Sequence, residues 1–291
     1  MLRVLLQATP LVLAGFVFTL SSFAAADLRQ PGQSPAKSYR QKVLDAGPVG
    51  YWRLGERQGP NAKDETKFGH NGTYHGKLFF GQPGAIRQDA DTSIRFDGSK
   101  AYVEVPASKA FSQPTSGKGM TVEVWMRPDA FDFKGETKDP YVFWLGKGMP
   151  GQQEWAFRFY TKNSTRPNRI SAYIFNKAGG LGSGAYVQEE IKPKEWIHLV
   201  ATFDPGNKNS PNAGVSIYKN GVLKGSPATQ KGSLYSAYDI MPEVGIAPLR
   251  FGTRSLTSFL VGGLDEVAIY PRVLTSAEIL DHYKTGSAKG K

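Results

Sequence analysis

The sequence predicts an all-β fold, a sandwich of two antiparallel sheets with one short C-terminal helix. Short apolar runs alternate with polar residues at a period of two, tight-turn dipeptides separate these runs, and no long helical pattern interrupts them. Aromatic residues form 12% of the chain, and 33 of its 291 residues are glycine. This composition is typical of strands joined by turns.

The elements follow in chain order. Ser38–Asp45 predicts a short helix that ends near Gly47-Pro48, and the strands begin at Val49. Met120–Arg127 is the clearest strand, because it alternates strictly and places Met120, Val122, Val124 and Met126 on one face. The other face carries Thr121, Glu123, Trp125 and Arg127. Four further runs have strand character: Trp155–Tyr160, Arg169–Phe175, Trp196–Phe203 and Val215–Tyr218.

Turn and cap signals complete the pattern. Asp97-Gly98 and Asn220-Gly221 are typical of hairpin turns. Thr275 and Glu278 form the S/T-x-x-E capping box that begins a helix, and Gly286 suits its end.

The N-terminal residues predict export. Residues 1–26 have the features of a secretory signal peptide, with Arg3, an apolar run over Val4–Leu20 and a small-residue cleavage site at Ala24–Ala26. A membrane anchor is the alternative for this run. We expect a flexible tether over 27–37, one domain over 38–286 and a disordered tail over 287–291. No later segment is apolar enough to span a membrane, so the mature chain is expected to be secreted, periplasmic or in the cell envelope.

Composition excludes several classes of function. The chain has no cysteine, which removes disulfide frameworks, Cys-based zinc sites and thiol nucleophiles. The formal net charge is +11, but the basic residues are scattered and no nucleic-acid recognition motif is present. Nucleic acid is therefore not an expected partner.

Nine segments follow one another along the chain: Pro48–Glu56, Asp64 with Gly69–Gly76, Ser93–Gly98, Ala101–Pro106, Thr121–Pro128, Glu195–Asp204, Val215–Val222, Leu249–Phe251 with Gly252, and Gly262–Ile279. Together and in this order they resemble the laminin-G-like, concanavalin-A-like jelly-roll (LamG-like) family of exported bacterial proteins. The resemblance implies two curved antiparallel sheets of about six strands each, with the N- and C-terminal segments adjacent. It covers most of the mature chain.

The sequence predicts no catalytic residue. A glycosidase of this fold needs two carboxylates on one strand face, and Glu123 has only Thr121 and Trp125 as same-face neighbours. Neither a zinc-binding H-E-x-x-H motif nor a G-x-S-x-G elbow is present. A hydrogen-bonded or solvated Glu123 is the alternative to a lone acid.

Carbohydrate binding is the expected function, because aromatic rings stack on sugar rings while polar side chains bind hydroxyls. The candidate residues lie on strand faces opposite the predicted core: Trp125, Glu123, Arg158, Tyr160 and Tyr173. Packing of these rings beneath loops is the alternative.

Calcium is the expected cofactor. In proteins that this chain resembles, a calcium ion often bridges the first and last segments, which implies Asp265 as a ligand, with Asp64 and Asp97 as further candidates. Asp265 capping backbone amides or pairing with a basic residue is the alternative.

Three hypotheses for function remain open at this point. The first is an exported, non-catalytic module that recognises a polysaccharide or cell-surface glycan, with acidic polysaccharide favoured by the charge. The second is a structural or adhesive envelope protein with a protein partner. The third is a polysaccharide-active hydrolase or lyase whose site the sequence does not reveal.

Overall fold

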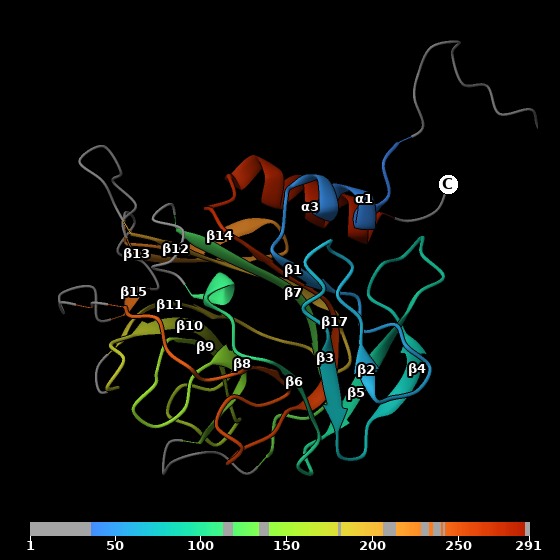
Figure 1. Ribbon diagram of the computed structural model, residues 1–291. Coiled ribbons are helices and arrows are strands. Elements are labelled where there is room, and N and C mark those ends of the chain that lie inside the picture. The colour runs from blue at the N-terminus through green and yellow to red at the C-terminus, as the bar shows by residue number, and fades with distance from the viewer. Residues whose placement is uncertain are drawn as a thin grey trace, which may run out of the picture. The chain divides into compact units, whose positions relative to one another are not determined.

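The alternating runs form two antiparallel sheets that pack face to face (Figure 1). The computed structural model describes residues 36–112, 119–133, 140–179, 182–205, 214–227, 233–234, 240 and 242–288. Lys37–Lys291 forms one compact unit. The predicted signal peptide lies outside the described residues, as do most of the predicted tether and part of the predicted tail. Neither α-helix of the described residues has the length and apolar character needed to cross a bilayer.

Sheet A has eight strands in the order β14-β13-β12-β7-β17-β5-β4, with β1 also paired to β17. Its strands in chain order are β1 (Gly50–Trp52), β4 (Phe79–Pro83), β5 (Thr92–Asp97), β7 (Met120–Pro128), β12 (Ile197–Asp204), β13 (Gly214–Lys219), β14 (Val222–Gly225) and β17 (Val261–Tyr270).

Sheet B has nine strands in the order β15-β11-β10-β9-β8-β16-β6-β3-β2. Both sheets exceed the expected six strands, and in sheet B the two-residue edge strands β2 and β15 account for part of the excess. The strands in chain order are β2 (Asn61–Ala62), β3 (Gly72–His75), β6 (Tyr102–Val105), β8 (Tyr141–Lys147), β9 (Trp155–Tyr160), β10 (Arg169–Phe175), β11 (Gly182–Gln188), β15 (Ser233–Leu234) and β16 (Leu249–Phe251).

The main core lies between the sheets. The predicted apolar face of β7, which carries Val122 and Val124, is fully buried there against residues of sheet B such as Phe157. The strict alternation of the sequence therefore predicts the inward face of this strand correctly. A 3-10 turn, η1 (Lys109–Phe111), adds Phe111 to the same core.

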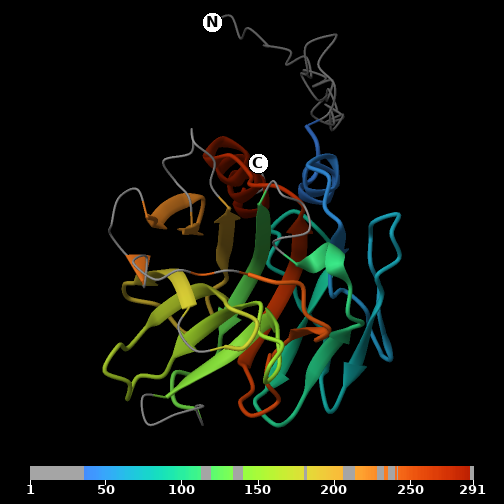
Figure 2. The same cartoon turned by 60° about the vertical axis from the view of Figure 1, so that its left-hand side comes forward.

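Two helices cover the outer face of sheet A. Helix α1 (Tyr39–Asp45) begins at the cap Ser38, and α3 (Ser276–Ser287) begins at Thr275 with both hydrogen bonds of the predicted capping box. Figures 1 and 2 show α1 in blue beside α3 in red, and Lys42 of α1 pairs with Asp281 of α3 at 2.6 Å. A second core, which includes Tyr39 and Ile279, fills the space between the helices and sheet A. The part of this outer face that lies beneath the helices is therefore an interior surface.

One strand near the C-terminus organises sheet A. β17 pairs with β7 on one side and with β1 and β5 on the other. A bulge between Asp265 and Ala268 interrupts its pairing with β7, and Glu266 within the bulge has a φ of 55°. The first and last strands of the sheet are thus hydrogen-bonded neighbours, as the family resemblance implies.

A buried ion pair next to sheet B anchors the segment that contains Gly245. Lys147 at the end of β8 is fully buried and pairs with Glu154, and its ammonium also donates to the carbonyl oxygen of Gly245 at 2.8 Å. The Gly245 amide in turn donates to Glu154 Oε1 at 3.0 Å. These bonds hold the segment at Gly245, just before β16, against the sheet.

Candidate functional site

The structure divides the five predicted carbohydrate-binding residues between two faces. Glu123 and Trp125 lie on the outer face of sheet A beneath the helices. Arg158, Tyr160 and Tyr173 lie on the outer face of sheet B. The five therefore cannot line one groove, because the sandwich separates them.

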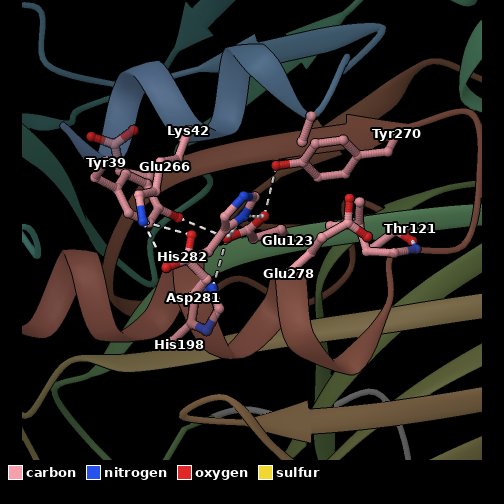
Figure 3. A network of polar contacts seen from close by, with 12 residues as sticks. Tyr39, Lys42, Thr121, Glu123, His198, Glu266, Tyr270, Glu278, Asp281 and His282 are labelled. Carbon is pink, nitrogen blue, oxygen red and sulfur yellow. Dashed lines mark hydrogen bonds and ion pairs between the residues drawn. The ribbon is translucent and has the colours of Figure 1, made fainter. Parts of the chain in front are cut away.

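Glu123 is the centre of a buried polar network (Figure 3). Its carboxylate accepts hydrogen bonds from Tyr39 at 2.9 Å and Tyr270 at 2.7 Å. Ring nitrogens of His198 and His282 lie 2.8 and 3.0 Å from it. Glu123 is fully buried. Its role as a sugar ligand is therefore not supported, and the hydrogen-bonded alternative describes it correctly.

The network holds opposite charges. Burial alone would raise the pKa of Glu123, but His282 and His198 more than offset this effect and hold that pKa well below its usual range. Burial alone would lower the pKa of His282, but the Glu123 carboxylate raises it above its usual value. The arrangement favours an ion pair that joins α3 to β7, with Tyr39 joining α1 to the same carboxylate.

Trp125 is almost completely buried, with 3% of its surface exposed. Its indole Nε1 donates to the Tyr39 hydroxyl at 3.1 Å, and its ring lies against α3 at Gly286. A Cβ at Gly286 would lie 2.7 Å from Trp125 Cζ2, so only glycine allows the helix to approach this closely. Trp125 thus has a packing role, and only its edge borders a cavity.

That cavity is the candidate binding site. It has a volume of about 510 Å³ and lies where α3 meets the connection between β4 and β5, the connection between β11 and β12, and the β13–β14 turn. Three aromatic residues border it, namely Trp125, Trp196 and Tyr283. The remaining lining residues are Gly84, Ala85, Arg87, Lys194, Glu195, Asn220 and Ser287.

Trp196 is the aromatic residue best placed for a ligand. Its side chain is partly exposed, and the Arg127 guanidinium lies 5.2 Å from its ring centre. A smaller cavity of about 140 Å³ shares Trp196, Glu195 and Asn220 with the first. Both cavities border this ring, which could stack on a ligand while charged and amide groups contact the ligand's polar atoms.

Sequence reasoning missed Trp196 and Tyr283. Alternation within Trp196–Phe203 does place Trp196 and His198 on one face, opposite Ile197. Only the pairing of His198 with Trp125 brings this face beside β7. The docking of α3 then adds Tyr283, a contact that no local pattern specifies.

The predicted residues on sheet B form an arginine–aromatic cluster. The Arg158 guanidinium lies 4.0 Å from the ring centre of Tyr173 and 4.8 Å from that of Phe143. Tyr160 and Tyr173 are at most 1% exposed. Because Arg158 lies over the ring of Tyr173 and both tyrosines are covered, these rings offer no free surface to a sugar, and the alternative of packed rings holds.

Two of the three predicted calcium ligands are occupied within the protein. The oxygens of Asp64 accept bonds from the amides of Tyr51, Thr66 and His70 and from the Thr66 hydroxyl. Asp97 Oδ1 accepts from the amide and hydroxyl of Ser99. Asp97 also pairs with Val261, four residues from Asp265 along β17 and so about 13 Å away. The three aspartates do not fit one calcium site.

Asp265 is the remaining candidate. Its Oδ2 accepts from the Ala85 amide at 2.7 Å, while its Oδ1 is buried without a hydrogen-bond partner. Within the described part of the chain, no three His, Asp or Glu side chains are grouped so that they could hold a metal ion. Calcium at Asp265 therefore stays a prediction that would depend on backbone oxygens.

Replacing Asp265 by Asn tests this prediction. Burial and the Glu266 carboxylate raise the pKa of Asp265 well above its usual value, so the ionised form costs stability at neutral pH. Without calcium, we expect Asp265→Asn to raise the free energy of unfolding at pH 7.5, because Asn removes the buried charge. Thermal melts of the parent chain and the variant, in EDTA and then in calcium, compare their stabilities and test whether calcium stabilises the parent chain. A midpoint of the parent chain that is the same in EDTA and calcium would refute a structural calcium ion.

The fold and the sequence both match known proteins. Residues 97–280 match the family described as the concanavalin A-like lectin/glucanases superfamily. The search of curated proteins gave no match. Domain 4 of AbnA, an extracellular arabinanase from Geobacillus stearothermophilus solved with arabinotriose, superposes with a TM-score of 0.56 at 17% identity. That alignment covers 81% of this chain and 98% of the domain.

Botulinum neurotoxin binding domains have the same fold. The binding domain of neurotoxin DC, solved with SialylT, superposes with a TM-score of 0.58 at 10% identity, over 84% of this chain and 52% of that one. The receptor-binding domain of type G gives 0.52 at 12% identity, over 81% and 51%. This chain therefore spans about half of each toxin domain. The match to the family extends over more than half of the chain, and the chain belongs to the concanavalin A-like lectin/glucanases superfamily.

Proposed function

We propose that this chain is a carbohydrate-binding module and that the cavity beside α3 is its glycan site. The partly exposed ring of Trp196 carries the proposal, because it borders a polar cavity of about 510 Å³ together with Tyr283 and Asn220. A sugar presents an apolar C–H face that packs on an aromatic ring and hydroxyl groups that bind amide and charged side chains.

The structural neighbours support a sugar as the ligand. One was solved with arabinotriose and another with SialylT. Among the described residues, the carboxylate at the centre of the clearest strand, Glu123, is enclosed by hydrogen bonds. Because this carboxylate is already engaged within the protein, the geometry supports a binding role better than a catalytic one. Export with cleavage near Ala26 is part of the proposal, and N-terminal sequencing of the protein recovered outside the cytoplasm tests it.

Replacing Trp196 by Ala should weaken glycan binding by about tenfold, since loss of a stacked ring costs about 1–1.5 kcal/mol. A glycan array and arabinotriose titrations identify ligands, and affinity electrophoresis compares the variants. Phe68→Ala is the matched control, because Phe68 is 52% exposed and lies outside the cavity. Trp125→Ala is a poor probe, since Trp125 is buried and its loss would also destabilise the fold.

Two outcomes contradict the proposal. Equal binding by Trp196→Ala and the parent chain would place the glycan elsewhere. Binding to no glycan on the array would favour the alternative of a structural protein with a protein partner.

A further inference from the structure

Two cationic side chains border the cavity beside α3. Arg87 and Lys194 both border it and both are exposed. Among the described residues, neither has an ion-pair partner within 4 Å. Three other cations of sheet A and its flanking segments have ion-pair partners: Lys42 with Asp281, Lys219 with Glu189 and Arg272 with Glu278. Among the described residues, the two cations at the cavity thus lack the ion pairs that Lys42, Lys219 and Arg272 form.

The acidic residue of the cavity does not neutralise them. Glu195 lies 4.0 Å from the ammonium of Lys192, a residue outside the larger cavity. The side chains that border the larger cavity thus carry two positive charges, from Arg87 and Lys194, against one negative charge from Glu195.

Backbone hydrogen bonds fix the two segments that carry these cations. The Arg87 amide donates to the carbonyl of Gly286 in α3 at 3.1 Å, and the Lys194 amide donates to the carbonyl of Pro128 at 2.7 Å. Lys194 lies two residues before Trp196, and Arg87 enters from the separate connection between β4 and β5. A ligand on the Trp196 ring would therefore lie within a site whose two cations come from different segments.

We infer that the site selects glycans with anionic substituents, carboxylate or sulfate, which Arg87 and Lys194 bind. This inference rests on the proposed function and names its ligand class. A guanidinium binds a carboxylate or sulfate through two parallel N–H donors, and the lysine ammonium adds a second positive contact. The formal net charge of +11 favours the approach of a polyanion.

Matched pairs of probes test the inference. The galacturonic acid trimer and its methyl ester differ in the charge of their carboxyl groups, and dextran sulfate and dextran differ in sulfate. We expect the charged member of at least one pair to bind at least tenfold more tightly in 50 mM NaCl, with the advantage falling as salt rises. The pair that responds distinguishes carboxylate from sulfate.

Two variants test whether the preference for charged probes arises at this cavity. The double variant Arg87→Gln/Lys194→Gln should reduce the affinity ratio within the responding pair to about one. Lys100→Gln, an exposed lysine in the turn after β5, should keep the parent ratio. Equal binding within both pairs, or an unchanged ratio in the double variant, overturns the inference but leaves the proposed function standing. Binding to none of the probes or array glycans overturns both.

Discussion

Replacing Glu123 by Gln should lower the free energy of unfolding by about 3 kcal/mol, because it removes the charge from a buried pair while the histidine partners remain. The amide of Gln also turns one acceptor oxygen into a donor, opposite groups that already donate. Urea unfolding at pH 6, followed by tryptophan fluorescence, measures the loss.

Asp132→Asn is the matched control for this variant. Asp132 pairs with Lys162 at 3.0 Å, and the two side chains are 63% and 58% exposed. Loss of such a pair should cost less than about 1 kcal/mol. Equal losses in the two variants would show that the buried network adds no stability beyond a surface pair.

The Glu123 variant should also change the pH dependence of stability. The pKa of Glu123 is lowered, so its contribution is present above the ordinary value of 4.5 and is lost as pH falls through the lowered pKa. The pKa of His282 is raised, so its contribution is present below 6.5 and is lost as pH rises through the raised pKa. The pair therefore contributes fully between about pH 4.5 and 6.5.

Glu123→Gln should flatten the loss of stability above pH 6.5, since Glu123 supplies the attraction that raises the His282 pKa. Burial also raises the pKa of Glu266 to about 7, but Glu266 is present in both proteins. The difference between the two pH profiles thus reports on the pair. Parallel profiles would contradict the assignment.

Replacing Lys147 by Met should cost about 3–5 kcal/mol, because it leaves Glu154 buried without its counter-charge. The variant also removes the hydrogen bond to the Gly245 carbonyl oxygen, which anchors the segment before β16. Chemical denaturation at pH 7 measures the free energy of unfolding. The side chains have similar lengths, so the missing charge dominates the result.

The double variant Lys147→Met/Glu154→Gln provides the control. It removes both charges, and we expect it to recover more than half of the loss, as buried pairs exchanged for neutral side chains do. Burial already raises the pKa of Glu154, which favours its neutral form once Lys147 is gone. A double variant less stable than the single one would show that Lys147 acts through its packing.

Local patterns predicted much of the fold. The alternation of Met120–Arg127 gave the inward face of β7, and the Thr275–Glu278 capping box marked the start of α3. Both signals depend on residues within one turn or one strand. They are therefore independent of how the rest of the chain packs.

The site could not be predicted in the same way. Alternation shows that Trp125 points away from the inter-sheet core, but it does not show that α1 and α3 cover that face. The same pattern fits an exposed ring and a ring beneath a helix. The cavity needs the register of His198 with Trp125 and the docking of Tyr283, which are contacts between segments far apart in the chain.

The position of β17 has a consequence for the order of folding. This strand supplies the pairing partner of β1, β5 and β7, yet it begins only at Val261. A growing or truncated chain that ends before Val261 holds the neighbouring strands of sheet A without the one that joins them. Such long-range pairing forms slowly, because distant segments lose loop-closure entropy when they meet, before their stabilising contacts have formed. Sheet A therefore becomes complete only after nearly the whole chain is available.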